Sequence, residues 1–222
     1  MFNVLRNGST PVSLASRRKY DSKDVLEALN KVFHKKCYIC ETSEPLDINV
    51  EHFVPHEGDE DLKFDWSNLY FSCGRCNNIK LAKYDDLLDC CDPNIDVVRA
   101  IKHLPPLMPY GGNLRIEAQY NDNITQLTAE LLNRVFNSEH TTNKAISSVS
   151  LRKKVFEQYN LLLTQVNNYY NPVALPKDKE DAIERIKLLI KASSPYSAFI
   201  SWCILEDTEL KPILQDFIGI AE

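Results

Sequence analysis

Two stretches of this chain decide its fold: residues 37–56, CYICETSEPLDINVEHFVPH, and residues 66–80, WSNLYFSCGRCNNIK. Each stretch contains one C-x-x-C motif, and together the motifs supply Cys37, Cys40, Cys73 and Cys76. A C-x-x-C turn brings two thiolates close together, and Zn²⁺ prefers four such soft ligands in a tetrahedron. The two motifs therefore predict one structural zinc ion per chain, bound by all four cysteines.

A redox-active cysteine pair is the alternative interpretation of a C-x-x-C motif, but that chemistry does not need two matched pairs. Four thiolates also leave no open coordination position, so the zinc is expected to stabilise a module too small to be held by burial alone. The remaining cysteines, Cys90, Cys91 and Cys203, are interpreted as structural thiols.

Length and composition place the chain among ordinary globular proteins. It has 222 residues, of which 44% are hydrophobic and 26% charged. No apolar stretch approaches the roughly 20 residues needed to span a bilayer. The first residues, MFNVLRNGST, lack the apolar core of a secretory signal. We therefore expect a soluble, cytoplasmic protein with no membrane partner.

The formal charge of −5 is distributed unevenly. Residues 1–36 contain 8 Lys/Arg and 3 Asp/Glu, a balance of +5, whereas residues 37–94 contain 4 and 13, a balance of −9. Residues 95–222 contain 14 and 15, a balance of −1. A basic arm beside an acidic segment fits a phosphate-contacting surface next to a metal site, and it equally fits a solvated acidic loop.

Apolar periodicity predicts an α+β chain. Residues 1–20 form a polar arm that we expect to be irregular apart from a short strand over 2–6, and a helix follows Asp21 or Ser22. Leu46, Ile48 and Val50 alternate with polar residues, which predicts a half-buried strand leading into residues 51–56. The apolar run 69–71 predicts a second strand, and residues 77–83 predict a helix after it.

Proline and glycine cluster in residues 93–113, which we interpret as a connection between two parts of the chain. The predicted organisation is an N-terminal arm, helix and zinc-bound core over 1–92, this connection, and a helical region over 114–222. Apolar stripes in the last part predict helices around 127–135, 146–166, 183–190 and 199–204.

Between and beside the two C-x-x-C motifs, the chain carries Glu51-His52, then Asn68, then Asn77 directly after Cys76. This order resembles the HNH nucleases, which have a ββα-metal fold, and the resemblance covers residues 37–83. It implies a zinc-stapled ββα-metal nuclease core followed by a mainly helical C-terminal region.

The resemblance also implies a role for each motif residue. His52 would be the general base that activates water, and Glu51 and Asn77 would hold a catalytic Mg²⁺ ion against the scissile phosphate. Asn68 would hold the loop and orient His52 through backbone contacts, and Lys80 would contact a substrate phosphate. His56 has no set position in the HNH pattern, so contact with the metal, contact with a phosphate and simple solvation remain its alternatives.

These residue types suit phosphodiester hydrolysis on chemical grounds. The reaction needs a base that deprotonates water and a cation that neutralises charge on the phosphoryl group and the leaving oxygen. An imidazole is neutral and basic at cytosolic pH, because its ordinary pKa is near 6.5. Carboxylate and amide oxygens are hard ligands that suit Mg²⁺.

The wording of residues 51–55, 66–73 and 87–89 resembles the HNH subunits of Septu-type anti-phage defence systems, called PtuB, and HNH proteins carried by some retrons. This resemblance implies a partner, a PtuA-like ABC-type ATPase, and a nucleic-acid substrate, with DNA preferred. One alternative is a ribonuclease that cleaves tRNA with the same site. The other is a non-catalytic, zinc-ribbon-like nucleic-acid-binding adaptor, against which the joint presence of His52 and Asn77 argues.

Overall fold

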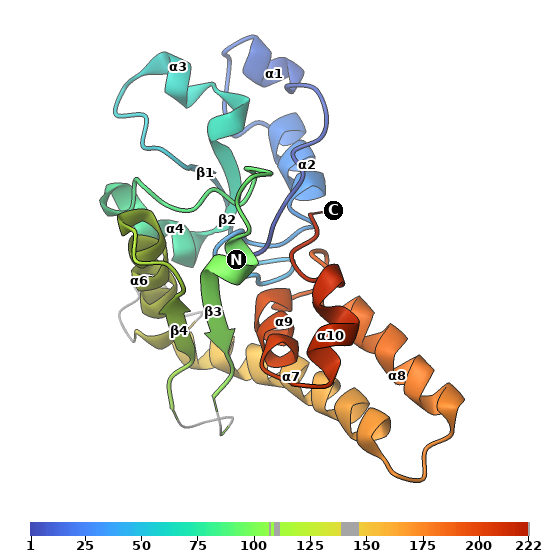
Figure 1. Cartoon of the computed structure of the whole chain (residues 1–222). Helices are drawn as coiled ribbons and strands as arrows, with labels where there is room; N and C mark the ends of the chain where they lie inside the picture. The colour runs from blue at the N-terminus through green and yellow to red at the C-terminus, as the bar shows by residue number, and fades with distance from the viewer. Residues whose placement is uncertain (107, 109–111, 139–146, 222) are drawn as a thin grey trace.

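The computed structural model describes residues 1–106, 108, 112–138 and 147–221, which form an α+β fold with two small antiparallel sheets (Figure 1). The strands are β1 Ile48–His52, β2 Leu69–Cys73, β3 Ile101–Leu104 and β4 Arg115–Ala118. The α-helices are α1 Val12–Ala15, α2 Lys23–Val32, α3 Glu60–Lys63, α4 Gly74–Lys80, α5 Val97–Ala100, α6 Asn123–Asn137, α7 Ser148–Tyr170, α8 Pro176–Leu189, α9 Ser197–Leu205 and α10 Leu210–Leu214. Short 3₁₀ turns are η1 Trp66–Asn68, η2 Leu81–Lys83 and η3 Gln215–Phe217.

The hairpin of β1 and β2 is followed directly by helix α4. The strands pair antiparallel, with Ile48 opposite Cys73 and His52 opposite Leu69. Helix α4 begins at Gly74, directly after β2 ends, and the Gly74 N–H donates to the Asp47 carbonyl over 3.0 Å. A Cβ atom at Gly74 would lie 2.0 Å from Oδ2 of the exposed Asp47 side chain, so any other residue here would force that side chain to move.

The apolar alternation does not mark a uniformly buried face of strand β1, although Val50 packs against the main core. Leu46 is 98% exposed and Ile48 is 45% exposed, whereas Glu51 is only 7% exposed. The expected apolar face is therefore wrong for the first part of this strand. The physical reason is that a buried cation, Lys80 of α4, pairs with Glu51 and makes its burial tolerable.

The N-terminal arm is more ordered than its composition indicates. The arm contains helix α1, and among the described residues the predicted strand over 2–6 is absent. Met1, Phe2 and Val4 are instead buried in an extended segment, in which the Val4 N–H donates to the carbonyl of Cys90. Burial of these apolar side chains explains why a polar arm is ordered.

Residues 93–113 are not a simple connection. They contain α5 and β3, whose residues Val97, Ala100 and Ile101 belong to the main hydrophobic core. That core extends from Met1 to Phe199, so the apolar packing joins the N-terminal and C-terminal parts. The region after 113 also begins with a strand, β4, which pairs with β3, before its helices start.

The four helices predicted from apolar stripes are present over the described residues as α6, α7, α8 and α9. Ile146, the first residue of the second stripe, lies outside the described residues. Helices α7 and α8 form a long hairpin whose tip lies at the end of the molecule away from β1 and α3 (Figure 1). Within the described part of the chain, no helix is both long and apolar enough to cross a membrane.

A buried polar network joins the first C-x-x-C motif to helix α9. The carboxylate of Glu41 lies 3.2 Å from the Met1 ammonium and 3.4 Å from the Lys36 ammonium, and all three groups are at most 1% exposed. The Ser197 hydroxyl also donates to Glu41 Oε2 over 3.1 Å. Burial alone would raise the pKa of Glu41, but the two ammonium groups lower it to about 2. Glu41 is therefore a charged link between the zinc-motif region and the C-terminal helices.

The substitution Glu41→Gln should lower the free energy of unfolding by about 3–5 kcal/mol, because it leaves two buried ammonium groups without a counter-charge. Urea denaturation of the full chain measures this change. Glu44→Gln is the matched control, since Glu44 pairs with Lys35 at the surface, with its side chain 69% exposed, and should have little effect. An equal effect of both substitutions would contradict the buried network as a source of stability.

Candidate metal centre and catalytic site

The four cysteines of the C-x-x-C motifs come together in one buried cluster. Their sulfur atoms all lie within 4.8 Å of one another, and each residue is 0% exposed. Two ligands come from the turn before β1, one from the end of β2 and one from the first turn of α4: these are Cys37 and Cys40, Cys73, and Cys76. The predicted four-cysteine cluster is confirmed.

The geometry of the cluster fits a tetrahedral zinc ion. Zn–S bonds of about 2.3 Å in a tetrahedron place the sulfur atoms about 3.8 Å apart. The Sγ atoms of Cys40 and Cys73 are 3.8 Å apart. Burial raises the pKa of the Cys76 thiol well above its ordinary value, so a cluster of thiolates here requires a cation. The chemistry of the donor set therefore suits a structural zinc ion.

Neighbouring polar groups support the cluster. The Thr42 hydroxyl lies 3.2 Å from Cys40 Sγ and 3.0 Å from the hydroxyl of Tyr196, and the Cys76 N–H donates to Cys73 Sγ over 3.4 Å. Hydrogen bonds to ligand sulfur atoms orient them and tune a metal site. Tyr196 immediately precedes α9, so the C-terminal helices contribute to the surroundings of the cluster.

His52 lies at the end of β1, where its ring is held by the loop that joins the two strands. Its Nε2 atom lies 3.1 Å from the backbone carbonyl of Lys63. A carbonyl can only accept a hydrogen bond, so Nε2 carries the proton and Nδ1 is left as the basic nitrogen of the neutral ring. Burial lowers the pKa of His52 below 6.5, and nearby positive charge lowers it further. The imidazole is therefore neutral and able to accept a proton at neutral pH.

Asn68 ties together the two ends of the same loop. Its Oδ1 accepts from the Val54 N–H over 2.7 Å, and its Nδ2 donates to the Val54 carbonyl over 2.9 Å and to the Leu62 carbonyl over 3.0 Å. Val54 follows His52 by two residues, and Leu62 precedes Lys63, whose carbonyl binds the His52 ring. These hydrogen bonds make Asn68 an anchor for the loop that orients His52.

Lys80 does not occupy the position expected of a phosphate contact. Its side chain is 0% exposed, its Nζ lies 2.9 Å from Oε1 of Glu51, and it donates to the His52 carbonyl over 3.1 Å. Burial raises the pKa of Glu51 above 4.5, and the Lys80 ammonium offsets only part of this rise. Lys80 therefore holds the end of β1 against α4, and in this structure it neutralises the carboxylate expected to bind magnesium.

The substitution Lys80→Met should lower the free energy of unfolding by about 3–5 kcal/mol, because it leaves the Glu51 carboxylate buried without a partner. The double substitution Lys80→Met/Glu51→Gln should recover part of this loss, since it removes both charges. Thermal or urea unfolding measures both variants. Lys83→Met is the control, because the ion pair of Lys83 with Glu130 is exposed. The interpretation fails if the double variant is less stable than Lys80→Met.

Asn77 and His56 are the two remaining residues that the sequence predicts for this site. Asn77 is half-buried in the middle of α4, and among the described residues no hydrogen bond joins it to Glu51 or His52. Joint metal binding by Glu51 and Asn77 stays a prediction. The His56 ring lies 4.7 Å from the His52 ring, and its Nδ1 accepts from the Gly58 N–H over 3.1 Å.

The N-terminal arm makes contacts around this site that the sequence did not predict. The Tyr20 ring packs edge-on against His52 at a centroid distance of 4.8 Å, and Arg17 forms an ion pair with Asp61 of α3. Arg6 donates to the backbone carbonyls of Trp66 and Leu69, both over 2.9 Å. No sequence signal identifies these partners, because 44 or more residues separate Arg17 from Asp61 and Arg6 from its acceptors.

Comparison with known proteins adds no relative: no protein-family model matches the chain, and no curated protein matches it significantly.

Proposed function

We propose that this chain is a metal-dependent endonuclease of the HNH type that hydrolyses phosphodiester bonds in nucleic acid, with DNA as the preferred substrate. The observation that carries the proposal is the state of His52. The Lys63 carbonyl selects the neutral tautomer of His52 in which Nδ1 is free to accept a proton. His52 directly follows Glu51, whose carboxylate is buried. The order of hairpin, helix and four-cysteine cluster supports the same proposal.

In this proposal, His52 Nδ1 accepts a proton from the attacking water. Asn68 keeps the His52 ring in place by anchoring the loop that carries the Lys63 carbonyl. Glu51 and Asn77 are the residues that would hold Mg²⁺, since their oxygen atoms are hard ligands. When bound, the ion would neutralise charge on the phosphate. Because Lys80 already pairs with Glu51, metal binding by this carboxylate would require the Lys80 contact to be shared or broken.

A non-catalytic nucleic-acid-binding adaptor is the second candidate, and one observation favours it. Glu51 is 7% exposed and is neutralised by a fully buried lysine, so the carboxylate is poorly accessible to a metal in this state. A ribonuclease that acts on tRNA would use the same residues, because the site recognises mainly the phosphate. The resemblance to Septu-type subunits supports a role as the effector of an anti-phage complex with an ABC-type ATPase.

The test is cleavage of duplex DNA and of tRNA by the zinc-loaded chain, with Mg²⁺ or with EDTA, alone and together with the proposed ABC-type ATPase partner. We expect Mg²⁺-dependent cutting that leaves 5′-phosphate ends, and the nucleic acid that is cut separates the two nuclease proposals. Absence of cutting in every combination, with binding of nucleic acid retained, would favour the adaptor.

The variant Asn77→Ala should raise the Mg²⁺ concentration needed for half-maximal cutting by about tenfold, because one hard ligand is lost. Excess Mg²⁺ should restore part of the rate. Asn78→Ala is the matched control, since Asn78 is the exposed neighbour on the same helix. A Mg²⁺ requirement that is unchanged in Asn77→Ala would remove Asn77 from the metal site.

A further inference from the structure

A second cluster of reactive groups lies outside the zinc centre and away from His52, at the turn that contains Cys90 and Cys91. The side-chain donor atoms of Asp89, Cys90 and Cys91 all lie within 4.8 Å of one another. Cys90 is 1% exposed, whereas Cys91 is half-buried. The turn therefore places one partly exposed cysteine directly beside one buried cysteine.

The surroundings of Cys91 favour its thiolate. Arg6 Nη2 lies 3.5 Å from Cys91 Sγ. A hydrogen bond from the Cys90 thiol and the charge of Arg6 lower the pKa of Cys91, although burial and Asp89 oppose them. Burial instead raises the pKa of Cys90 well above its ordinary value and that of Cys203 to about 12. Cys91 is thus the cysteine outside the zinc cluster that has the most nucleophilic character.

The arginine beside Cys91 also holds the start of strand β2. Arg6 Nη1 donates to the carbonyls of Trp66 and Leu69, which flank the loop anchor Asn68, and the guanidinium lies 4.8 Å from the centre of the Tyr70 ring. Asp89 accepts from the Tyr70 hydroxyl and from the Cys91 N–H.

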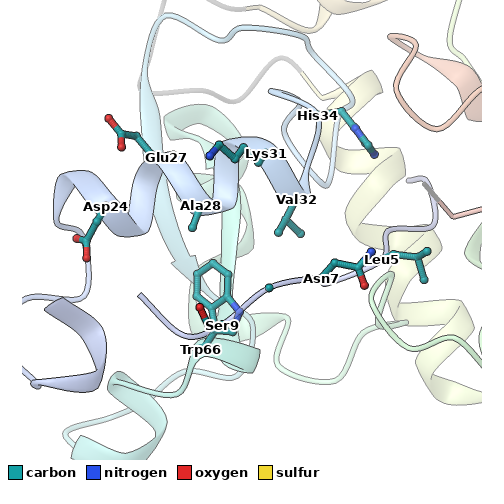
Figure 2. Close-up of a pocket in the computed structure, with 11 residues that line it drawn as sticks. Leu5, Asn7, Ser9, Asp24, Glu27, Ala28, Lys31, Val32, His34 and Trp66 are labelled. Atoms are coloured by element: carbon teal, nitrogen blue, oxygen red, sulfur yellow. The ribbon is translucent and has the colours of Figure 1, made fainter. Parts of the chain in front are cut away.

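The segment around Arg6 also lines, together with Trp66 and α2, a groove of about 430 Å³ (Figure 2). Arg6 therefore links Cys91 to the start of β2, beside the loop that Asn68 anchors.

We propose that Cys90 and Cys91 form a peroxide-sensitive thiol pair whose oxidation releases Arg6 from its contacts with the start of β2. The Cys91 thiolate attacks one oxygen of hydrogen peroxide: an S–O bond forms, the O–O bond breaks and hydroxide leaves. The Cys90 sulfur then attacks the resulting sulfenic acid. An S–S bond forms, the S–O bond breaks, and the proton of Cys90 leaves with the hydroxide as water. The two sulfur atoms lose two electrons, which reduce the peroxide.

The disulfide that results is expected to be easily reduced. Adjacent Cα atoms are about 3.8 Å apart, which is shorter than the separation of about 4.4–6.8 Å found in most disulfides. Strained disulfides have more oxidising potentials and belong to the labile, regulatory kind. A dithiol reductant should therefore return the pair to two thiols. A metal site on the same residues is disfavoured, because the positive charge of Arg6 lies against Cys91.

The test treats the zinc-loaded full chain with hydrogen peroxide in the presence of dimedone, which traps sulfenic acids, and locates the adducts by mass spectrometry. Cys91 should be labelled about tenfold faster than Cys203, which serves as the internal reference. Without dimedone, the peptide that contains both residues should lose two hydrogen atoms and regain them with dithiothreitol. Labelling of Cys203 or of the zinc ligands at the same rate as Cys91 would overturn the proposal.

Two variants keep the test decisive. Cys90→Ser should accumulate the Cys91 sulfenic acid without forming the disulfide, whereas Arg6→Met should slow the labelling of Cys91 by about tenfold. Oxidation of the wild type should also speed amide hydrogen exchange across residues 62–69, because Arg6 no longer holds the Trp66 and Leu69 carbonyls. Unchanged exchange after complete oxidation would refute the release of Arg6. None of these readouts requires nuclease activity, so they fail or succeed independently of the proposed function.

Discussion

Replacing His52 with alanine should lower the rate of nucleic-acid cleavage by about two to four orders of magnitude, the usual contribution of a general base. Melting and zinc content should remain close to those of the wild type, because the ring is only partly buried and lies outside the cysteine cluster. Single-turnover cleavage with saturating Mg²⁺ measures the loss directly and separates it from effects on product release.

His56→Ala is the matched comparison for this experiment. The two rings lie 4.7 Å apart, but His56 Nδ1 already accepts a backbone hydrogen bond from Gly58 and is not free to take a proton from water. We therefore expect the loss in His56→Ala to be much smaller. Cleavage at the wild-type rate by His52→Ala would eliminate His52 as the base, and an equal loss in both variants would point to a shared role of the histidine pair.

The substitution Cys73→Ser should abolish stoichiometric zinc binding and unfold the hairpin together with α4. Cys73 ends β2, caps α4, and lies 3.8 Å from Cys40 within the cluster. Structural zinc contributes on the order of 10 kcal/mol in small zinc domains, and here the cluster lies within the main core. A loss of even about half of that free energy corresponds to a fall of roughly 10–20 °C in melting temperature for a chain of this size.

Metal analysis and calorimetry of the purified full chain check this prediction, with Cys203→Ser as the control. Cys203 is a half-buried cysteine of α9 outside the cluster, so its replacement should keep zinc at one ion per chain and change melting far less. If Cys73→Ser melts like the wild type and still holds one zinc ion, the four-cysteine centre is not what stabilises this part of the fold.

Short-range patterns predicted the parts of the structure that depend on local geometry. The spacing of the C-x-x-C motifs identified all four members of the cluster, since a turn of this kind brings its own two thiolates together. The apolar run 69–71 lies in β2, and the stripe over 127–135 lies in α6. These patterns are sufficient because β2 is buried along its whole length and α6 buries the face that its apolar residues mark.

The predictions that failed depend on contacts between elements that are distant in the sequence. Leu46 and Ile48 were expected to face the core, but the structure buries Glu51 because Lys80 neutralises it from another element. For the same reason Lys80, which looks like a surface lysine at the end of a helix, is fully buried. The connection predicted at 93–113 contains a core strand, because β3 pairs with a strand that lies beyond the proline-rich segment.

The same distinction between local patterns and distant contacts applies to the candidate catalytic site. The order of Glu51, His52, Asn68 and Asn77 in the sequence was sufficient to single out these residues and their chemistry. Which nitrogen of His52 is free, how Asn68 holds its loop and what neutralises Glu51 depend on backbone carbonyls and side chains up to 29 residues away. Sequence alone thus determined which residue types are available, whereas the tertiary structure decided their charge state and tautomer. The physical reason is that both depend on burial and on partners from other elements, which no local pattern records.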